Sequence, residues 1–327
     1  MNQRKIWIDW AKVLSIFAII WGHCFPEGMS GFIYAFNVPV FFIISGYLCK
    51  REKSFGICFD KALHNLIIPY FILAAIKVAG PIIKHIGDGE WLWSVLAVAG
   101  GFHSLHGASG CSNLWFVYSL VIIKFIFQLS RPRFDFIFIG LFFLGAIIYN
   151  KDQNLEWRWA VTNVLLAYPF FIIGNLLRGS NLPQQALSFA KSHKATALAS
   201  AAVLFAATYF IGEFNGQADM YMGRYGNNIL LFVVGSLLGS SAVFITSFLL
   251  DSYSNKFCYV ISSGTIVMLV FHRELLHPLL KEITKLDLNS LFATNSLIFV
   301  SAAAVTVTFY PILLIVKRFF PIVLGRR

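Results

Sequence analysis

Residues 229–250 read ILLFVVGSLLGSSAVFITSFLL, 22 positions without a charged side chain. A helix needs about 20 mostly apolar residues to cross the hydrocarbon core of a bilayer, so this stretch predicts a membrane-spanning helix. Nine further stretches of similar character lie at about 6–26, 31–49, 62–83, 114–130, 134–150, 159–177, 195–212, 257–276 and 291–316. Residues 91–102 are apolar but short, and we interpret them as an interfacial or re-entrant piece. The sequence therefore predicts an all-α, polytopic membrane helical bundle of about ten transmembrane helices.

The composition supports this class of protein. Of 327 residues, 58% are apolar and only 13% are charged, and the mean hydropathy is +0.72. These values exclude a disordered chain, a soluble nucleic-acid-binding protein and a small disulfide scaffold. The net charge of +11 could suggest anionic partners. In a membrane protein, however, basic residues mostly hold loops in the cytoplasm, so no nucleic-acid partner is expected. Membrane lipids are the expected surroundings.

The distribution of basic residues predicts the topology. With the N-terminus in the cytoplasm, 16 of the 26 Lys and Arg residues fall on the cytoplasmic side, 6 on the opposite side and 4 within spans. This asymmetry favours an even number of spans with both termini cytoplasmic. The apolar stretch at the N-terminus carries Asp9 and Lys12 and lacks a small-residue cleavage site, so no cleavable signal peptide is expected. No linker resembles a domain boundary, and residues 1–327 are predicted to form a single transmembrane domain.

Small and sulfur-containing residues are expected to serve packing. The five cysteines are scattered and form no CxxC pair, so neither a disulfide framework nor a metal site is predicted. Gly235 and Gly239 form a GxxxG pair, which favours close helix packing.

The first predicted span carries three ionisable residues, Asp9, Lys12 and His23. Such groups cost several kcal/mol in a membrane unless they are paired or hydrated, so each is a functional candidate. Lys12 and His23 are 11 residues apart, which places them on one helix face and about 16–17 Å apart along the axis. One extended ligand could reach both. Asp9 lies one turn before Lys12 and could pair with it. The alternative is that Asp9 and Lys12 mark the cytoplasmic interface and His23 is an ordinary interfacial histidine.

Other polar features stand out beyond the first span. Span two contains Pro39, which predicts a kink, followed by Ser45 and Gly46 near its inner end. A cytoplasmic basic cluster of Lys50, Arg51, Lys53 and Lys61 could bind phosphates or only set topology. Trp115 opens span four, where an aromatic belt is expected. His272, Arg273 and Glu274 lie near the outer end of span nine, and a functional and a structural interpretation of them are equally open.

Several motifs together resemble one known family. They are IDWAKVLSIFAIIWGH at 8–23, VPVFFIISGYL at 38–48, Pro69-Tyr70, LWFV at 114–117, FFIIGNLLR at 170–178 and Phe271-His272. The chain resembles the acyltransferase-3 family of integral membrane O-acyltransferases, in particular its fucose 4-O-acetylase-like branch. The first two motifs are the specific ones. The family's basic residue and histidine, with ten positions between them, match Lys12 and His23. Its later Arg-x-x-Arg pair corresponds to Lys61 and His64, a departure from the pattern.

The resemblance implies a membrane O-acetyltransferase of the bacterial cytoplasmic membrane. Such an enzyme takes an acetyl group from acetyl-CoA as co-substrate, without a metal, and passes it to a sugar hydroxyl of a cell-surface glycan or its lipid-linked precursor. Lys12, Arg51 and Lys61 would hold the CoA phosphates, with Ser45 also in the acetyl-CoA site. The pantetheine arm would then bring the thioester to His23, which suits the predicted 16 Å separation.

His23 is the predicted catalytic residue in this interpretation. We favour its role as general base on the sugar hydroxyl, for which an ordinary imidazole is well suited. A nucleophilic role, in which His23 carries the acyl group, is the alternative. Trp115 would stack on the sugar, His272 and Arg273 would orient the acceptor, and Asp9 would support Lys12.

Two other functional classes remain open from the sequence. A transporter or flippase for a lipid-linked glycan would also have about ten spans, intramembrane charges and kinked helices. Such proteins often show two related halves, and none is evident here. A structural membrane protein would need no histidine in line with a buried lysine. Acyl transfer by the purified protein would distinguish an acyltransferase from both of these alternatives.

Overall fold

The fold is described from a computed structural model that covers residues 4–84, 87, 89, 91–151, 159–283 and 290–325. Arg158, Lys285, Arg326 and Arg327, which entered the charge count above, lie outside the described residues. So does most of the predicted outer loop at 151–158. The described chain is almost entirely helical, and its four strands have two residues each.

The fold class is confirmed as an all-α polytopic bundle. Among the described residues, seven helical segments are long and apolar enough to cross a membrane. They are Ser30–Leu48, Phe55–Lys84, Pro132–Tyr149, Ala160–Gly179, Lys194–Asn215, Ile229–Leu249 and Leu291–Phe319. The bent pair Lys256–Ser263 and Thr265–Ile283 makes an eighth if it is counted as one span. Predicted spans 6–26 and 114–130 correspond to shorter helices of 17 and 15 residues. The count of ten and the side of the termini stay predictions.

The chain packs as two compact units. The first unit comprises Met1–Ile44, Leu176–Asp219 and Tyr225–Ile315, and the second comprises Ser45–Asn175, Met220–Arg224 and Val316–Arg327. Because the chain enters each unit more than once, neither is a continuous segment of sequence. Whether 1–327 acts as a single domain stays a prediction.

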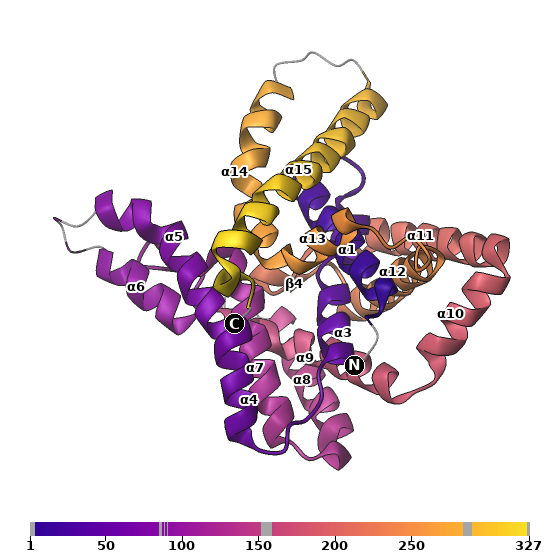
Figure 1. Ribbon diagram of the computed structural model, residues 1–327, viewed down its shortest axis with the longest axis horizontal. Coiled ribbons are helices and arrows are strands. Elements are labelled where there is room, and N and C mark those ends of the chain that lie inside the picture. The colour runs from indigo at the N-terminus through magenta and orange to yellow at the C-terminus, as the bar shows by residue number, and fades with distance from the viewer. Residues whose placement is uncertain are drawn as a thin grey trace. The chain divides into compact units, whose positions relative to one another are not determined.

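The first unit is built around α1 (Ile6–Gly22). Its other elements are α2 (Ser30–Phe36), the start of α3 (Pro39–Leu48), α10 (Leu182–Ser192), α11 (Lys194–Asn215), β3 (Ala218–Asp219), α12 (Ile229–Leu249), α13 (Lys256–Ser263), α14 (Thr265–Ile283) and most of α15 (Leu291–Phe319). α11 packs along α12, and α2 contacts both (Figure 1). α1 contacts α2, α12, α13 and α14.

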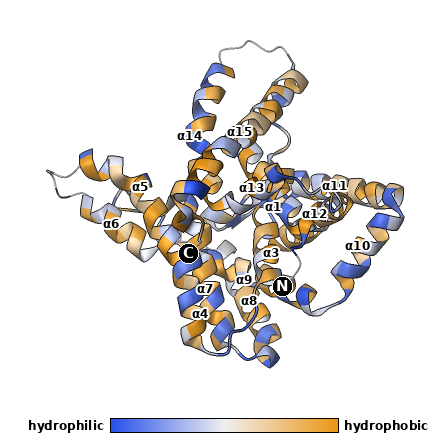
Figure 2. Cartoon of the chain, viewed as in Figure 1, coloured by the Kyte–Doolittle hydropathy of each residue, from blue (hydrophilic) through white to orange (hydrophobic). Residues whose placement is uncertain are grey.

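Glycines permit the close approach of α2 to its neighbours. A Cβ on Gly239 would clash with Phe36, whereas one on Gly235 would make only ordinary contacts, so the close packing predicted for the GxxxG pair is found at Gly239. Gly31 of α2 and Gly212 of α11 face one another so closely that a Cβ on either would meet the backbone of the other. Apolar residues cover α12 and α3, whereas α10 carries more polar ones (Figure 2).

The second unit consists of shorter helices and turns. Its elements are α4 (Phe55–Ala62), a π-helical turn (Leu63–Ile67), α5 (Ile68–Lys84), α6 (Trp91–Gly100), β1 (Ser104–Leu105), β2 (Ala108–Ser109), α7 (Trp115–Leu129), α8 (Asp135–Lys151) and most of α9 (Ala160–Gly179). It also contains the 3-10 turns Ser112–Leu114, Pro132–Phe134, Met220–Met222 and Pro321–Leu324. Of the short strand β4 (Arg224–Tyr225), the first residue belongs to this unit and the second to the other. β1 and β2 pair antiparallel. Burial raises the pKa of the Cys111 thiol, in the loop before α7, to about 12, so this cysteine is a packing residue as predicted.

Two of the predicted spans contain breaks. The kink expected at Pro39 is a true interruption: α2 ends at Phe36 and α3 begins at Pro39. Asn37 lies buried in this break. The second break separates α13 from α14 and bends the chain by 86°. It occurs at Gly264, where any Cβ would clash with Leu313.

Candidate functional site

The helix α1 provides the geometry expected for its ionisable residues. α1 continues unbroken to Gly22, and His23 follows as its C-cap with φ −74° and ψ −2°. Lys12 and His23 are therefore on one regular helix, about 16 Å apart along its axis. Both side chains are half-buried. Ile16 and Ile19, which are almost fully buried, lie between them on the same face.

His23 lies beside the imidazole of His272, which α14 provides. The ring centroids are 4.7 Å apart and the ring planes are tilted by 57°. His272 has no exposed surface, whereas His23 is half-buried. His23 therefore has surface that a ligand can contact, whereas His272 has none.

Each of these imidazoles is oriented by its own helix. Nδ1 of His23 lies 2.8 Å from the carbonyl oxygen of Ile19, and Nδ1 of His272 lies 2.9 Å from that of Met268. A carbonyl oxygen only accepts hydrogen bonds, so Nδ1 is the donor in both neutral rings. The lone pair of each neutral ring is consequently on Nε2. Nε2 of His272 is buried and has no hydrogen-bond partner among the described residues.

A phenol and a guanidinium complete the surroundings of the pair. The Tyr34 ring of α2 lies 6.4 Å from the His23 ring, and its hydroxyl donates to the Gly22 carbonyl at 3.3 Å. Arg273 is half-buried and interacts electrostatically with both histidines. In the described part of the chain, no hydrogen bond or ion pair occupies its guanidinium.

At the other end of α1, Asp9 joins this helix to α13. One carboxylate oxygen accepts from the hydroxyl of Ser262 at 2.5 Å, and the other pairs with Arg4 at 2.6 Å. The pairing of Asp9 with Lys12, which the spacing suggested, is therefore replaced by pairing with Arg4, which lies just before the helix. No hydrogen bond or ion pair occupies Lys12 among the residues described, although Asp9 is close enough to stabilise its charge.

The broken helix thus contacts α1 at two levels. α13 brings Ser262 to Asp9, and α14, after the 86° bend, brings His272 to His23. Irregular backbone at membrane depth is tolerated where it is buried in protein or lines a water-filled cavity. The bend at buried Gly264 is of the first kind. It allows α13 and α14 to contact α1 at both of its polar ends.

The other predicted site residues belong to the second unit. Arg51 donates from Nε to the carbonyls of Phe127 and Ser130, and its Nη2 pairs with Asp135 at 2.6 Å. The guanidinium also lies 3.9 Å from the centroid of the Phe127 ring. Most of the donors of Arg51 are therefore engaged within the protein, which does not suit the predicted phosphate role.

The remaining predicted residues of this unit have different surroundings. Lys61 is exposed and pairs with Glu52 at 2.8 Å, and His64 lies 3.3 Å from the Asp60 carboxylate. His64 falls in the π-helical turn of 63–67. Ser45 is half-buried. Trp115 is only 6% exposed, which leaves little ring surface for a sugar to stack on.

Sequence reasoning missed Ser262, Tyr34 and Asp135. A serine or tyrosine in an apolar helix carries no signal of the partner it will meet, and Asp135 appeared only as a residue at the start of a span. The acidic residue at the start of the predicted span 134–150 gave no indication that Arg51 would be its partner. In the described ranges, no group of three or more His, Cys, Asp or Glu side chains could hold a metal ion.

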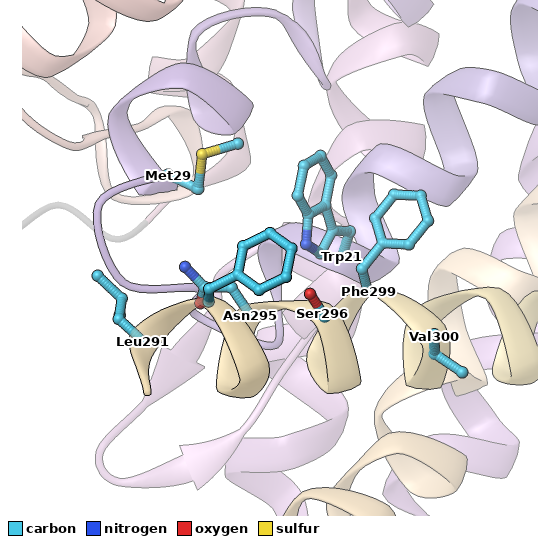
Figure 3. A pocket seen from close by; sticks show the side chains of 8 residues that line it. Trp21, Met29, Leu291, Asn295, Ser296, Phe299 and Val300 are labelled. Atoms are coloured by element: carbon cyan, nitrogen blue, oxygen red, sulfur yellow. The ribbon is translucent and has the colours of Figure 1, made fainter. Parts of the chain in front are cut away.

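An apolar cavity of about 510 Å³ lies beside the end of α1 that carries His23. Figure 3 shows Trp21 of α1 and Met29 opposite Asn295, Ser296 and Phe299 of α15. Phe299 contacts the Trp21 ring edge-to-face at 5.2 Å. Lipid chains fill apolar recesses of this kind in a bilayer, so the cavity alone does not indicate a substrate site.

Comparisons with known proteins agree with the resemblance noted from the sequence. A family described as an acyltransferase domain, acyltransferase-3, matches residues 5–315. The glucans biosynthesis protein C of Salmonella schwarzengrund is 25% identical over 284 residues, which cover 74% of this chain and 70% of the relative. Proteins of the same name from Salmonella heidelberg and Salmonella typhi are 24% identical over the same length. No solved structure matches the chain.

Proposed function

Because this chain belongs to the acyltransferase-3 family and is a multi-pass membrane acyltransferase, we propose that it acetylates a sugar hydroxyl with His23 as general base. The donor is acetyl-CoA from the cytoplasm. The acceptor is a cell-surface glycan or its lipid-linked precursor, and the membrane is the bacterial cytoplasmic membrane. The printed name of the relatives, glucans biosynthesis protein C, makes glucans the first acceptors to test.

One observation carries this proposal: the Nε2 lone pair of a half-buried imidazole at the end of α1. The hydrogen bond from Nδ1 of His23 to Ile19 fixes the tautomer in which Nε2 can accept a proton. A general base must present this lone pair to the hydroxyl that attacks the thioester. The partial exposure of His23 gives the substrate access to it.

Lys12 supports the other half of the proposal. Its ammonium forms no hydrogen bond or ion pair within the described chain, so it is available to an anionic ligand. Phosphate oxygens form charge-assisted contacts with such a group. We assign the CoA phosphates to Lys12 and give Arg51 a structural role because Asp135 engages it, while the phosphate contacts of Lys61 and Ser45 stay predictions from the sequence.

The acceptor contacts are proposed on the same basis. Arg273 is half-buried, lies near His23, and has five donors in a planar fork that can hold sugar hydroxyls. Trp115 is left out of the acceptor site because of its burial. Asp9 supports the site by fixing α13 to α1 through Ser262.

Transfer of radioactive acetyl groups by the purified protein in lipid nanodiscs tests this function. Wild-type protein with acetyl-CoA and a glucan or lipid-linked sugar fraction should yield a product heavier by one acetyl group. His23→Ala should abolish transfer without changing thermal stability. His193→Ala is the matched control, since His193 is an exposed histidine of the same unit. Full activity of His23→Ala would refute the base role.

A second measurement separates the two roles of His23. If His23 is the base, protein incubated with labelled acetyl-CoA and no acceptor, then quenched, carries no label. A label on His23 would instead show a nucleophilic mechanism.

A further inference from the structure

We infer that His272 shares a proton with His23, so that the two imidazoles act as one base during acyl transfer. This inference rests on the proposed function and changes the role of His272 from orienting the acceptor to assisting the proton transfer.

The hydrogen bonds of the pair leave only one place for a shared proton. Both Nδ1 atoms donate to carbonyls four residues earlier, of Ile19 and Met268. Both Nε2 atoms of the neutral rings are therefore acceptors. As long as both rings are neutral, neither can donate to the other through Nε2. A proton added to His23 changes this, because its new Nε2–H is a donor and the ring 4.7 Å away carries an acceptor.

The Nε2 lone pair of His272 is buried and accepts no hydrogen bond within the described part of the chain. The residue has no exposed surface, and its Nε2 has no hydrogen-bond partner among the described residues. Leaving a buried acceptor unsatisfied is unfavourable, and such atoms are rare in native structures. A protonated His23, whose ring centroid lies 4.7 Å away, would satisfy it.

The charges around the pair limit it to one extra proton. Arg273 and His277 of α14 interact electrostatically with His23. From α2 the pair faces Tyr34, which in turn interacts with Cys24 and with Asp219 of β3. Two protonated rings 4.7 Å apart and beside Arg273 would repel one another. The pair therefore cycles between no extra proton and one.

The chemical step balances with this pair. The sugar oxygen attacks the thioester carbonyl carbon, forms the new ester bond, and gives its proton to Nε2 of His23. That N–H then donates to Nε2 of His272 while the carbon–sulfur bond breaks. The electron pair stays on sulfur, and the CoA thiolate takes the proton back from His23. The products are the acylated sugar and CoA, with both imidazoles neutral again.

Substitution of His272 by Leu tests the inference. Leu removes the buried unsatisfied nitrogen at similar volume, so thermal stability should stay equal or rise. The kcat should fall about 10- to 100-fold. The KM values for acetyl-CoA and acceptor should stay within about threefold. The ascending limb of the pH–rate profile should move to lower pH, because the protonated His23 loses its acceptor. His272→Gln, which retains an acceptor oxygen, should recover part of the rate.

The matched control is His193→Leu, the same change at an exposed histidine of the same unit that has no part in the pair. Its kcat should stay within about twofold of the wild type. The inference is overturned if His272→Leu keeps the wild-type kcat and pH limb. It is equally overturned if only the KM for the acceptor rises, since that result assigns His272 to acceptor orientation.

A measurement on the wild-type protein keeps the inference testable if the variants do not fold. Nitrogen-15 NMR of labelled histidines should show His23 and His272 taking up one proton together. Independent titration of two protons would contradict the shared pair. If wild-type protein transfers no acyl group at all, the proposed function fails, whereas an active enzyme with independent histidines refutes only the pairing.

Discussion

Asp135 accepts a 2.6 Å ion pair from Arg51, and only 6% of the Asp135 residue is exposed. Arg51 also donates to the carbonyls of Phe127 and Ser130, so this one side chain joins the segment before α4 to the end of α7 and the start of α8. Removing one partner of a buried pair leaves the other charge uncompensated, at a cost of about 3–5 kcal/mol. Arg51→Ala and Asp135→Ala should therefore each lower the unfolding temperature strongly.

The double variant sharpens this prediction. Arg51→Met combined with Asp135→Leu leaves no buried charge and should be more stable than either Ala variant. Arg133→Ala, which removes an exposed arginine, is the control and should change the unfolding temperature little. If Arg51→Ala instead leaves stability intact and raises the KM for acetyl-CoA, Arg51 is a phosphate ligand after all.

Lys12→Ala should weaken acetyl-CoA binding. The ammonium forms no hydrogen bond or ion pair in the described part of the chain, so its removal deprives a bound phosphate of a charge-assisted contact worth about 1.5–3 kcal/mol. The dissociation constant measured by calorimetry should rise about 10- to 100-fold. Lys12→Arg keeps the charge and should bind nearly as well as the wild type. Equal affinity of Lys12→Ala and an exposed-site control, Lys194→Ala, would remove Lys12 from the donor site.

The sequence predicted the fold class and much of the first unit correctly, for physical reasons. Long apolar stretches specify helices in a membrane because a helix satisfies its backbone hydrogen bonds within its own segment. The regular geometry of one helix also placed Lys12 and His23 on a common face before any tertiary contact was known. Within that helix, sequence distance converts directly into spatial distance.

Contacts between helices were not predictable in the same way. The approach of His272 to His23 depends on the 86° bend at Gly264, and an isolated glycine in an apolar run does not reveal a bend. The pairing of Asp9 with Arg4 and Ser262, rather than with Lys12, likewise depends on which helix packs against α1. The phosphate role of Arg51 was a prediction from its charge and the family resemblance, and neither shows that Asp135 lies within reach of its guanidinium.

Gly31 and Gly212 make a contact that tolerates no side chain. A Cβ on either residue would meet the backbone of the other, so Gly212→Ala should separate α2 from α11 and lower the unfolding temperature. Gly140→Ala is the matched control, because Gly140 is inside helix α8 and a Cβ there meets nothing within 4 Å. That variant should be neutral or slightly more stable, since Ala favours a helix by about 0.5–1 kcal/mol over Gly. Equal effects of the two variants would show that the α2–α11 crossing is not tight.

The direction of acyl transfer depends on the topology predicted from the basic residues. If both termini are cytoplasmic, the turn after α11 faces outward and the segment before α4 faces inward. The chain suits cysteine labelling, because Cys24, Cys58, Cys111 and Cys258 are buried and Cys49 can be replaced by Ala. A membrane-impermeant maleimide should label Gln217→Cys in intact cells, and Lys53→Cys only after permeabilisation. Both positions are exposed, so access to the reagent rather than burial decides the result. The reverse pattern would place the lysines predicted to bind phosphate outside and would be incompatible with the proposed cytoplasmic acetyl-CoA donor.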